Sequence, residues 1–106
     1  MTPHQTLHAR LAALDAEDAA GEAATKPVTL DQQSTGRLTR MDALQNQAMA
    51  QAQARRRQAE RRKIHAALQR LAEGDYGYCT DCGEAIAPAR LDADPAIALC
   101  LACMRG

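Results

Sequence analysis

The sequence predicts a mainly α-helical fold: an antiparallel two-helix coiled-coil hairpin followed by a small C-terminal module organised by four cysteines. Three observations support this prediction. Alanine recurs with Arg, Gln, Glu and Leu, residues that favour helices, whereas Trp and Phe are absent from the 106 residues. Residues 21–35 carry helix-breaking signals and separate two segments whose apolar residues recur at helical spacing. Two Cys-x-x-Cys pairs lie near the C-terminus.

The first helix is predicted over residues 3–20. Thr2 is a suitable N-cap, and Pro3 suits the first helical position because its missing N–H is not needed there. Gly21, followed by a Lys-Pro pair and β-branched residues, reads as the stop, so we expect a connector over residues 21–35. The apolar stripe of this helix is Leu7, Leu11 and Leu14.

The second helix is predicted over residues 36–73, which contain no proline and are followed by Gly74. It would span roughly 57 Å at 1.5 Å per residue. Its expected partner-facing stripe is Leu38, Met41, Leu44 or Gln45, Ala48 and Ala52. Residues 3–20 match residues 36–53 in length, so we expect an antiparallel hairpin domain over residues 1–73 and a separate module over residues 74–106.

A basic segment follows the point where this hairpin would run out of partner, near residue 53. Within it Glu60 is the one acidic residue, and the segment is polar all round, as an unpaired helix must be. We therefore expect a bare neck whose cations contact an acidic partner surface or are simply solvated. Its basic residues are Arg55, Arg56, Arg57, Arg61, Arg62 and Lys63. Beyond them, Ile64, Leu68 and Leu71 restore an apolar face, expected to pack on the C-terminal module.

The cysteine spacing predicts a zinc site with the ligands Cys79, Cys82, Cys100 and Cys103. Two thiolates three positions apart share one ion, and a second pair returned by a loop of 17 residues completes a tetrahedral shell. Disulfides or redox dithiols are the alternative, but we find no secretory leader and no βαβ pattern around either pair. The C-terminal module is therefore predicted to be a four-cysteine zinc finger with one structural Zn²⁺.

No enzyme activity is expected. Four cysteine ligands leave no coordination position for an activated water, and no serine, histidine and acid constellation offers a nucleophile. His4 and His8 lie four residues apart on one helix face, but two ligands are too few for a closed zinc site, so we expect them to be solvated.

The hydropathy of the sequence predicts no transmembrane segment. The formal net charge is zero and no run of eighteen apolar residues exists, so no membrane partner is expected and the cytoplasm is the default location. The charges are nevertheless uneven, because residues 1–36 are acidic and the neck is basic.

Residues 74–103 resemble the DksA/TraR transcription regulators, which carry a four-cysteine zinc finger on a coiled coil. The resemblance implies a protein that binds RNA polymerase directly, without sequence-specific DNA binding, and that inserts its coiled-coil tip through the secondary channel to alter promoter complexes. The matching residues are Asp75-Tyr76-Gly77-Tyr78 before Cys79, then Gly83, Ile86, Arg90-Leu91, Ala93, Pro95 and Cys100-Leu101-Ala102-Cys103. Gly77 and Gly83 are natural positions for positive φ in the knuckle turns.

The resemblance also points to a functional tip in the connector. The family pattern there is Asp-x-x-Asp-x-Ala, and its best counterpart is Asp31, Ser34 and Gly36, in which a hydroxyl replaces one carboxylate. Asp42 is the second candidate if the turn lies later, and a plain helix cap is the structural alternative for Asp31.

Basic residues of this helix face guanosine tetraphosphate in the family, which makes that alarmone a possible effector. Arg56 and Lys63 lie on one side of two helical turns, but Asp94 stands where a basic residue would help an anion bind. Two other function classes remain open. One is a nucleic-acid-binding zinc finger that uses residues 55–63, and the other is an adaptor that dimerises through its alanine-rich stripe.

Overall fold

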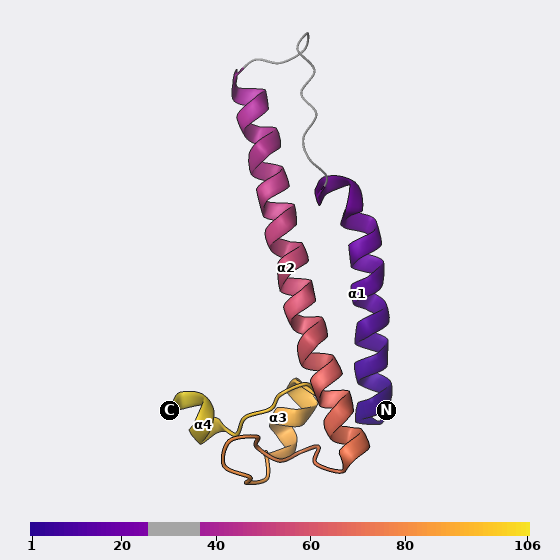
Figure 1. Cartoon of the computed structure of the whole chain (residues 1–106), viewed down its shortest axis with the longest axis vertical. Helices are drawn as coiled ribbons and strands as arrows, with labels where there is room; N and C mark the ends of the chain where they lie inside the picture. Colours follow the sequence, from indigo (N-terminus) through magenta and orange to yellow (C-terminus); the bar gives the residue numbers. More distant parts are fainter. Residues whose placement is uncertain (26–36) are drawn as a thin grey trace. The chain divides into compact units, whose positions relative to one another are not determined.

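A computed structural model describes residues 1–25 and 37–106, in which the protein is mainly helical (Figure 1). The helices are α1 (Pro3–Thr25), α2 (Arg37–Glu73), α3 (Pro88–Ala93) and α4 (Leu101–Arg105). An isolated antiparallel bridge joins Tyr78 to Ala85. The predicted tip residues Asp31, Ser34 and Gly36 lie outside the described residues.

The start of α1 is fixed by a reciprocal cap. The Thr2 hydroxyl accepts a hydrogen bond from the backbone N–H of Gln5 at 3.1 Å, and the Gln5 side chain accepts one from the N–H of Thr2 at 3.0 Å. Two backbone donors that the helix leaves unpaired are thereby satisfied. The predicted N-cap at Thr2 and helix start at Pro3 are confirmed.

The end of α1 differs from the prediction. The helix continues through Gly21 to Thr25, although glycine was expected to stop it near residue 20. A Cβ at Gly21 would lie 3.4 Å from Nη2 of Arg57, so α1 passes close to that guanidinium at this position. The alanines that follow Gly21 favour the helix and offset the cost of glycine inside it.

The described chain forms two compact units. The first unit contains Met1–Ala12 and Glu60–Gly106, and the second contains Ala13–Ala59. In each unit a stretch of α1 accompanies a stretch of α2. The proposed domain boundary at residue 74 stays a prediction.

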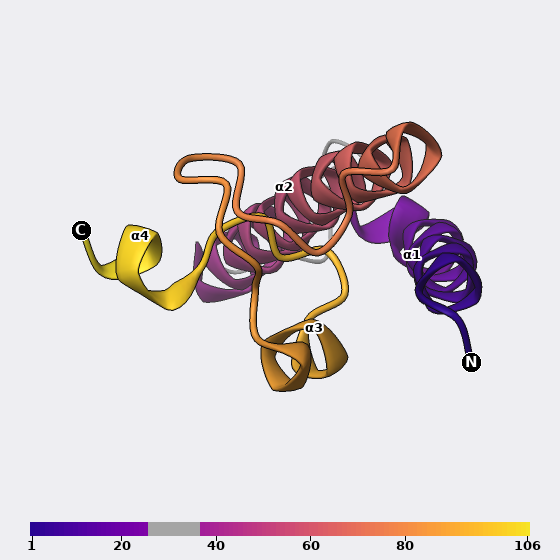
Figure 2. The ribbon, with the colours of Figure 1, turned by 90° about the horizontal axis from the view of Figure 1, so that it is seen from below.

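The first unit holds most of the buried apolar side chains among the described residues. Leu7 of α1 is 2% exposed, and the fully enclosed residues contributed by α2 are Ile64 and Ala67. Arg10 binds Glu60 through two hydrogen bonds, one of them 2.9 Å long. That contact lowers the pKa of Glu60 against the opposing effect of burial, so the pair stabilises the fold until the pH falls through the carboxyl's folded pKa. Figure 2 shows α3 and α4 joined by irregular chain in this unit.

A buried leucine and an ion pair join α1 to α2 in the second unit. Leu14 has no exposed surface, and Nε of Arg57 donates a 2.6 Å hydrogen bond to Asp18, with the Arg57 side chain only 15% exposed. Asp18, which comes after Arg10 in α1, pairs with Arg57, which comes before Glu60 in α2. The two helices are antiparallel, which confirms the predicted hairpin.

The predicted register of the hairpin is wrong. Matching residues 3–20 to residues 36–53 placed Asp18 near the start of the second helix, whereas Asp18 pairs with Arg57. Length matching assumed that a short turn sets the register, but burial of Leu7 and Leu14 together with the ion pairs sets it instead. The basic segment is consequently not a bare neck, because two of its members, Arg57 and Glu60, bind side chains of α1.

The predicted stripe on α2 is wrong for the same reason. Met41 and Leu44 are 55% and 47% exposed, Gln45 and Ala48 are exposed too, and Ala52 alone among its described side chains is half-buried. Nothing is described of the Leu38 side chain. A different helical row is half-buried instead, made of Ala43, Gln47, Ala50, Ala54 and Arg57.

We predict that Leu14→Ala destabilises the protein by about 2–5 kcal/mol, because the substitution removes a fully buried side chain and leaves a cavity. Leu44→Ala, the matched control, should cost less than about 0.5 kcal/mol because its side chain is exposed. Urea unfolding followed by far-UV circular dichroism measures both. Equal costs for the two variants would contradict the observed register.

Candidate metal centre

The first knuckle, residues 77–86, is a tight turn built by two glycines. Gly77 and Gly83 have φ of 93° and 77°, as the sequence predicted, and L side chains rarely adopt that conformation. The N–H of Gly83 bonds to the Cys79 carbonyl at 3.0 Å, and the N–H of Cys79 bonds to the Glu84 carbonyl at 2.8 Å. These bonds hold Cys79 and Cys82 on one turn.

The second knuckle places its cysteines at the start of a short helix. Cys100 is the N-cap of α4, and its carbonyl accepts a 3.0 Å bond from the N–H of Met104, which closes the turn that carries Cys103. The two knuckles are joined directly, because the N–H of Thr80 bonds to the Ala98 carbonyl at 2.9 Å. This link brings the two Cys-x-x-Cys pairs together.

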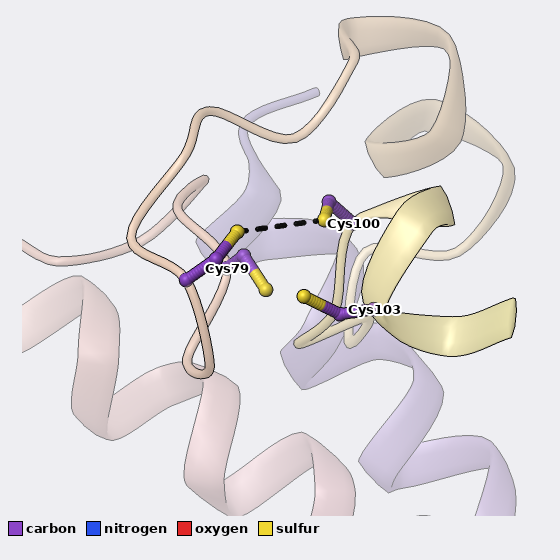
Figure 3. Close-up of side chains that lie close together, drawn as sticks. Cys79, Cys100 and Cys103 are labelled. Atoms are coloured by element: carbon purple, nitrogen blue, oxygen red, sulfur yellow. Dashed lines mark hydrogen bonds between the residues drawn. The ribbon is translucent and has the colours of Figure 1, made fainter. Parts of the chain in front are cut away.

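The four thiols form one cluster. All four Sγ atoms lie within 4.8 Å of one another, and those of Cys82 and Cys100 are 3.6 Å apart. Figure 3 shows the sulfurs of Cys79, Cys100 and Cys103 turned toward a common point. A tetrahedral zinc ion with bonds of about 2.3 Å separates its sulfurs by about 3.8 Å, so the cluster fits the ion. All four cysteines are free thiols, which excludes the disulfide alternative.

The protein environment acts unequally on the four thiols. Backbone N–H groups of Cys100 and Cys82 hydrogen-bond to the sulfur of Cys79 and lower its pKa to about 6. The neighbouring thiols of Cys100, Cys79 and Cys82 raise the pKa of Cys103. Four negative sulfurs at this separation repel one another, and a divalent cation among them removes that repulsion. The module holds one structural zinc ion, as the sequence predicted.

Few apolar side chains support the metal centre. Ile86 is 3% exposed, and the hydroxyl of Tyr76 donates a 2.9 Å hydrogen bond to the Pro95 carbonyl, which fixes the return segment. Nη2 of Arg90, on α3, donates to the Leu99 carbonyl at 3.4 Å, just before the second knuckle. The closed thiolate shell leaves the ion no open position, so its role is to fold the module.

The six predicted basic contact residues separate into two groups. Arg57 and Arg61 are half-buried, and Arg57 forms an ion pair with Asp18. The four exposed members are Arg55, Arg56, Arg62 and Lys63. This division could have been predicted from the sequence. Arg57 and Arg61 recur at helical spacing with the apolar Ile64 and Leu68, so all four lie on the same face of the helix.

The zinc module and the fold both resemble those of known proteins. Residues 74–105 match the family model described as the prokaryotic dksA/traR C4-type zinc finger. The computed structure superposes on transcription factor DksA2 from Pseudomonas aeruginosa with a TM-score of 0.67 and 28% identity, over 95% of this chain and 70% of that one. The chain is therefore similar to a DksA protein in its fold and to the dksA/traR family in its zinc module.

A curated relative supports the likeness over part of the sequence. The RNA polymerase-binding transcription factor DksA of Haemophilus influenzae is 46% identical over 52 residues, which are 46% of this chain. This chain spans 36% of that relative. The family model matches the zinc module, and the structural similarity to DksA2 covers most of the chain, helices included. No helix within residues 1–25 and 37–106 is long and apolar enough to cross a membrane.

We predict that the zinc-loaded module loses α3 and α4 when a strong chelator removes the ion, because its few buried side chains cannot order the chain unaided. Cobalt titration of the stripped protein should restore the fold at one equivalent, with absorption bands of four thiolate ligands. Cys103→Ser should lose one thiolate donor, whereas Met104→Ala, at the adjacent exposed position, should keep all four. A chelated protein with unchanged amide-exchange protection over residues 74–106 would contradict the role given to zinc.

Proposed function

We propose that this DksA-like chain is a transcription regulator that binds RNA polymerase and acts through the secondary channel, where the connector between α1 and α2 reaches toward the catalytic centre. The match of residues 74–105 to the dksA/traR finger carries the proposal. The antiparallel pairing of α1 with α2 supports it, because a hairpin presents its connector at the end of two helices. Regulation by binding is the proposed activity, and no catalytic role is assigned.

Exposed cations on α2 offer a contact surface for an acidic partner. Arg55, Arg56, Arg62 and Lys63 have exposed side chains, whereas Arg57 binds Asp18 of α1. Charges at the edge of an interface mainly accelerate association and set its salt dependence. We propose that these four side chains guide the chain to acidic groups at the rim of the polymerase channel.

Nucleic acid is the weaker alternative partner. Single-strand binding needs exposed aromatic side chains for base stacking, and the sequence has two tyrosines and no tryptophan or phenylalanine. Tyr76 is engaged with the Pro95 carbonyl, which leaves the half-exposed Tyr78 by itself. A basic helix without a stacking surface would bind duplex phosphates weakly and without sequence preference.

Guanosine tetraphosphate is proposed as no more than an accessory effector. Lys63 and Arg70 line a cavity of about 220 Å³ in the first unit, and Asp94 lines the same cavity. The carboxylate opposes an incoming phosphate, and Arg70 already donates weakly to the carbonyls of Ala96 and Ile97. We therefore propose polymerase binding that does not require the alarmone.

Polymerase binding is tested with the immobilised zinc-loaded chain, over which core RNA polymerase and random duplex DNA are passed separately at physiological salt. Polymerase should be retained with or without guanosine tetraphosphate. Replacement of all four exposed cations by alanine should weaken retention by about tenfold or more, and Arg105→Ala, an exposed cation on α4, should not. If DNA is retained and polymerase is not, the proposal is wrong and nucleic acid is the partner.

The tip assignment is tested by transcription. Asp31 is the first candidate because it lies in the connector, and Asp42, exposed on α2, is the second. We predict that Asp31→Ala abolishes the effect on multi-round transcription while polymerase retention stays normal, because the tip acts after docking. Asp42→Ala should keep the effect. Loss in the Asp42 variant alone would move the tip into α2.

A further inference from the structure

We propose that His4 and His8 form a second metal site, an open one that binds a divalent late transition-metal ion such as Ni²⁺, Cu²⁺ or Zn²⁺. Both side chains are exposed on the first turns of α1 and lie four residues apart. Neutral imidazole is a preferred ligand of these ions. The sequence alone suggested a solvated pair, and the arrangement of the two rings is what changes that expectation.

The distance between the ring nitrogens fits one ion. The Nε2 atoms of His4 and His8 are 3.2 Å apart, with ring centroids separated by 4.3 Å and planes tilted by 58°. Two imidazoles bound to one tetrahedral ion at about 2.0–2.1 Å have nitrogens about 3.3 Å apart. The rings therefore need little movement to place both Nε2 atoms around a metal.

The helix turn that carries the pair is held in place before any ion binds. Thr2 and Gln5 cap each other, and the hydroxyl of Thr6 donates to the Thr2 carbonyl at 3.1 Å. Leu7, between the two histidines in sequence, is 2% exposed and anchors the same turn in the first unit. Ligands whose backbone is already ordered lose less conformational entropy on binding.

The protonation change at this pair is simple. The present contact joins one Nε2–H to the lone pair of the other Nε2, since neutral imidazole has one donor and one acceptor nitrogen. On metal binding the donor ring carries its proton on Nδ1 instead, so that both Nε2 lone pairs face the ion. Water fills the remaining coordination positions.

The site differs in kind from the zinc finger. Among residues 1–25 and 37–106, the four cysteines are the one cluster of three or more metal-ligating side chains, so His4 and His8 act as two ligands without a third. The helix N-terminus also disfavours a nearby cation. Both facts make binding weak and exchangeable, and the bound ion would fasten the first two turns of α1 to each other.

The test is titration of the zinc-loaded full chain with Ni²⁺ by calorimetry, with a chromophoric chelator reporting any zinc released from the cysteines. We expect one Ni²⁺ per chain without zinc release, together with slower amide exchange in the first turns of α1. His4→Ala and His8→Ala should each weaken the affinity by about tenfold or more. The matched control His65→Ala, which removes the exposed histidine of α2, should leave it unchanged.

A spacing variant separates chelation from histidine content. His8→Ala combined with Ala9→His keeps three histidines but moves one imidazole off the shared face, so it should bind as weakly as His8→Ala. Circular dichroism should show every variant folded, because the substituted side chains are exposed. Equal Ni²⁺ affinity in all variants, or uptake accompanied by zinc release, would overturn the proposal, and neither result affects the polymerase assignment.

Discussion

Four sulfur atoms around one ion are the interaction on which the C-terminal third of the molecule depends. Between Gly74 and Gly106 the buried side chains are Cys79 and Ile86, too few to offset the conformational entropy of the segment by removal of apolar surface from water. The metal supplies that free energy through bonds to ligands that are far apart in sequence. A backbone hydrogen bond from Thr80 to Ala98 also joins the two knuckles directly.

The two long helices are stabilised by a few buried apolar side chains and by ion pairs, without a metal. Its buried residues among those described are Leu7, Leu14, Ile64 and Ala67, and small alanines elsewhere allow close approach of α1 and α2 with little enclosed volume. Ion pairs between α1 and α2, among them Arg10 with Glu60 and Arg57 with Asp18, supplement this thin core. The partly buried pair of Arg57 with Asp18 matters more than its exposed counterpart, because removing one partner would leave the other charge poorly solvated.

The local features could be predicted from sequence, and the long-range ones could not. Cysteine spacing, the two glycines of the first knuckle and the Thr2 cap each depend on residues a few positions apart, and all are found as predicted. The register of the hairpin depends on which residues meet across more than thirty positions, as Arg57 meets Asp18. Alanine-rich helices have several nearly equivalent apolar stripes, so periodicity favoured Met41 and Leu44 over the row that is actually half-buried. Gly21 was read as a stop because a sequence does not show that an arginine lies against it.

The two tyrosines have a practical consequence for anyone who follows this molecule in solution. Both lie at the edge of the first knuckle, Tyr76 tied to the Pro95 carbonyl and Tyr78 next to Cys79, and the chain has no tryptophan or phenylalanine. Ultraviolet fluorescence and near-ultraviolet dichroism therefore originate beside the sulfur cluster, whereas the far-ultraviolet signal comes chiefly from α1 and α2. The tyrosine signals can therefore follow the C-terminal module separately from the helix content of the chain.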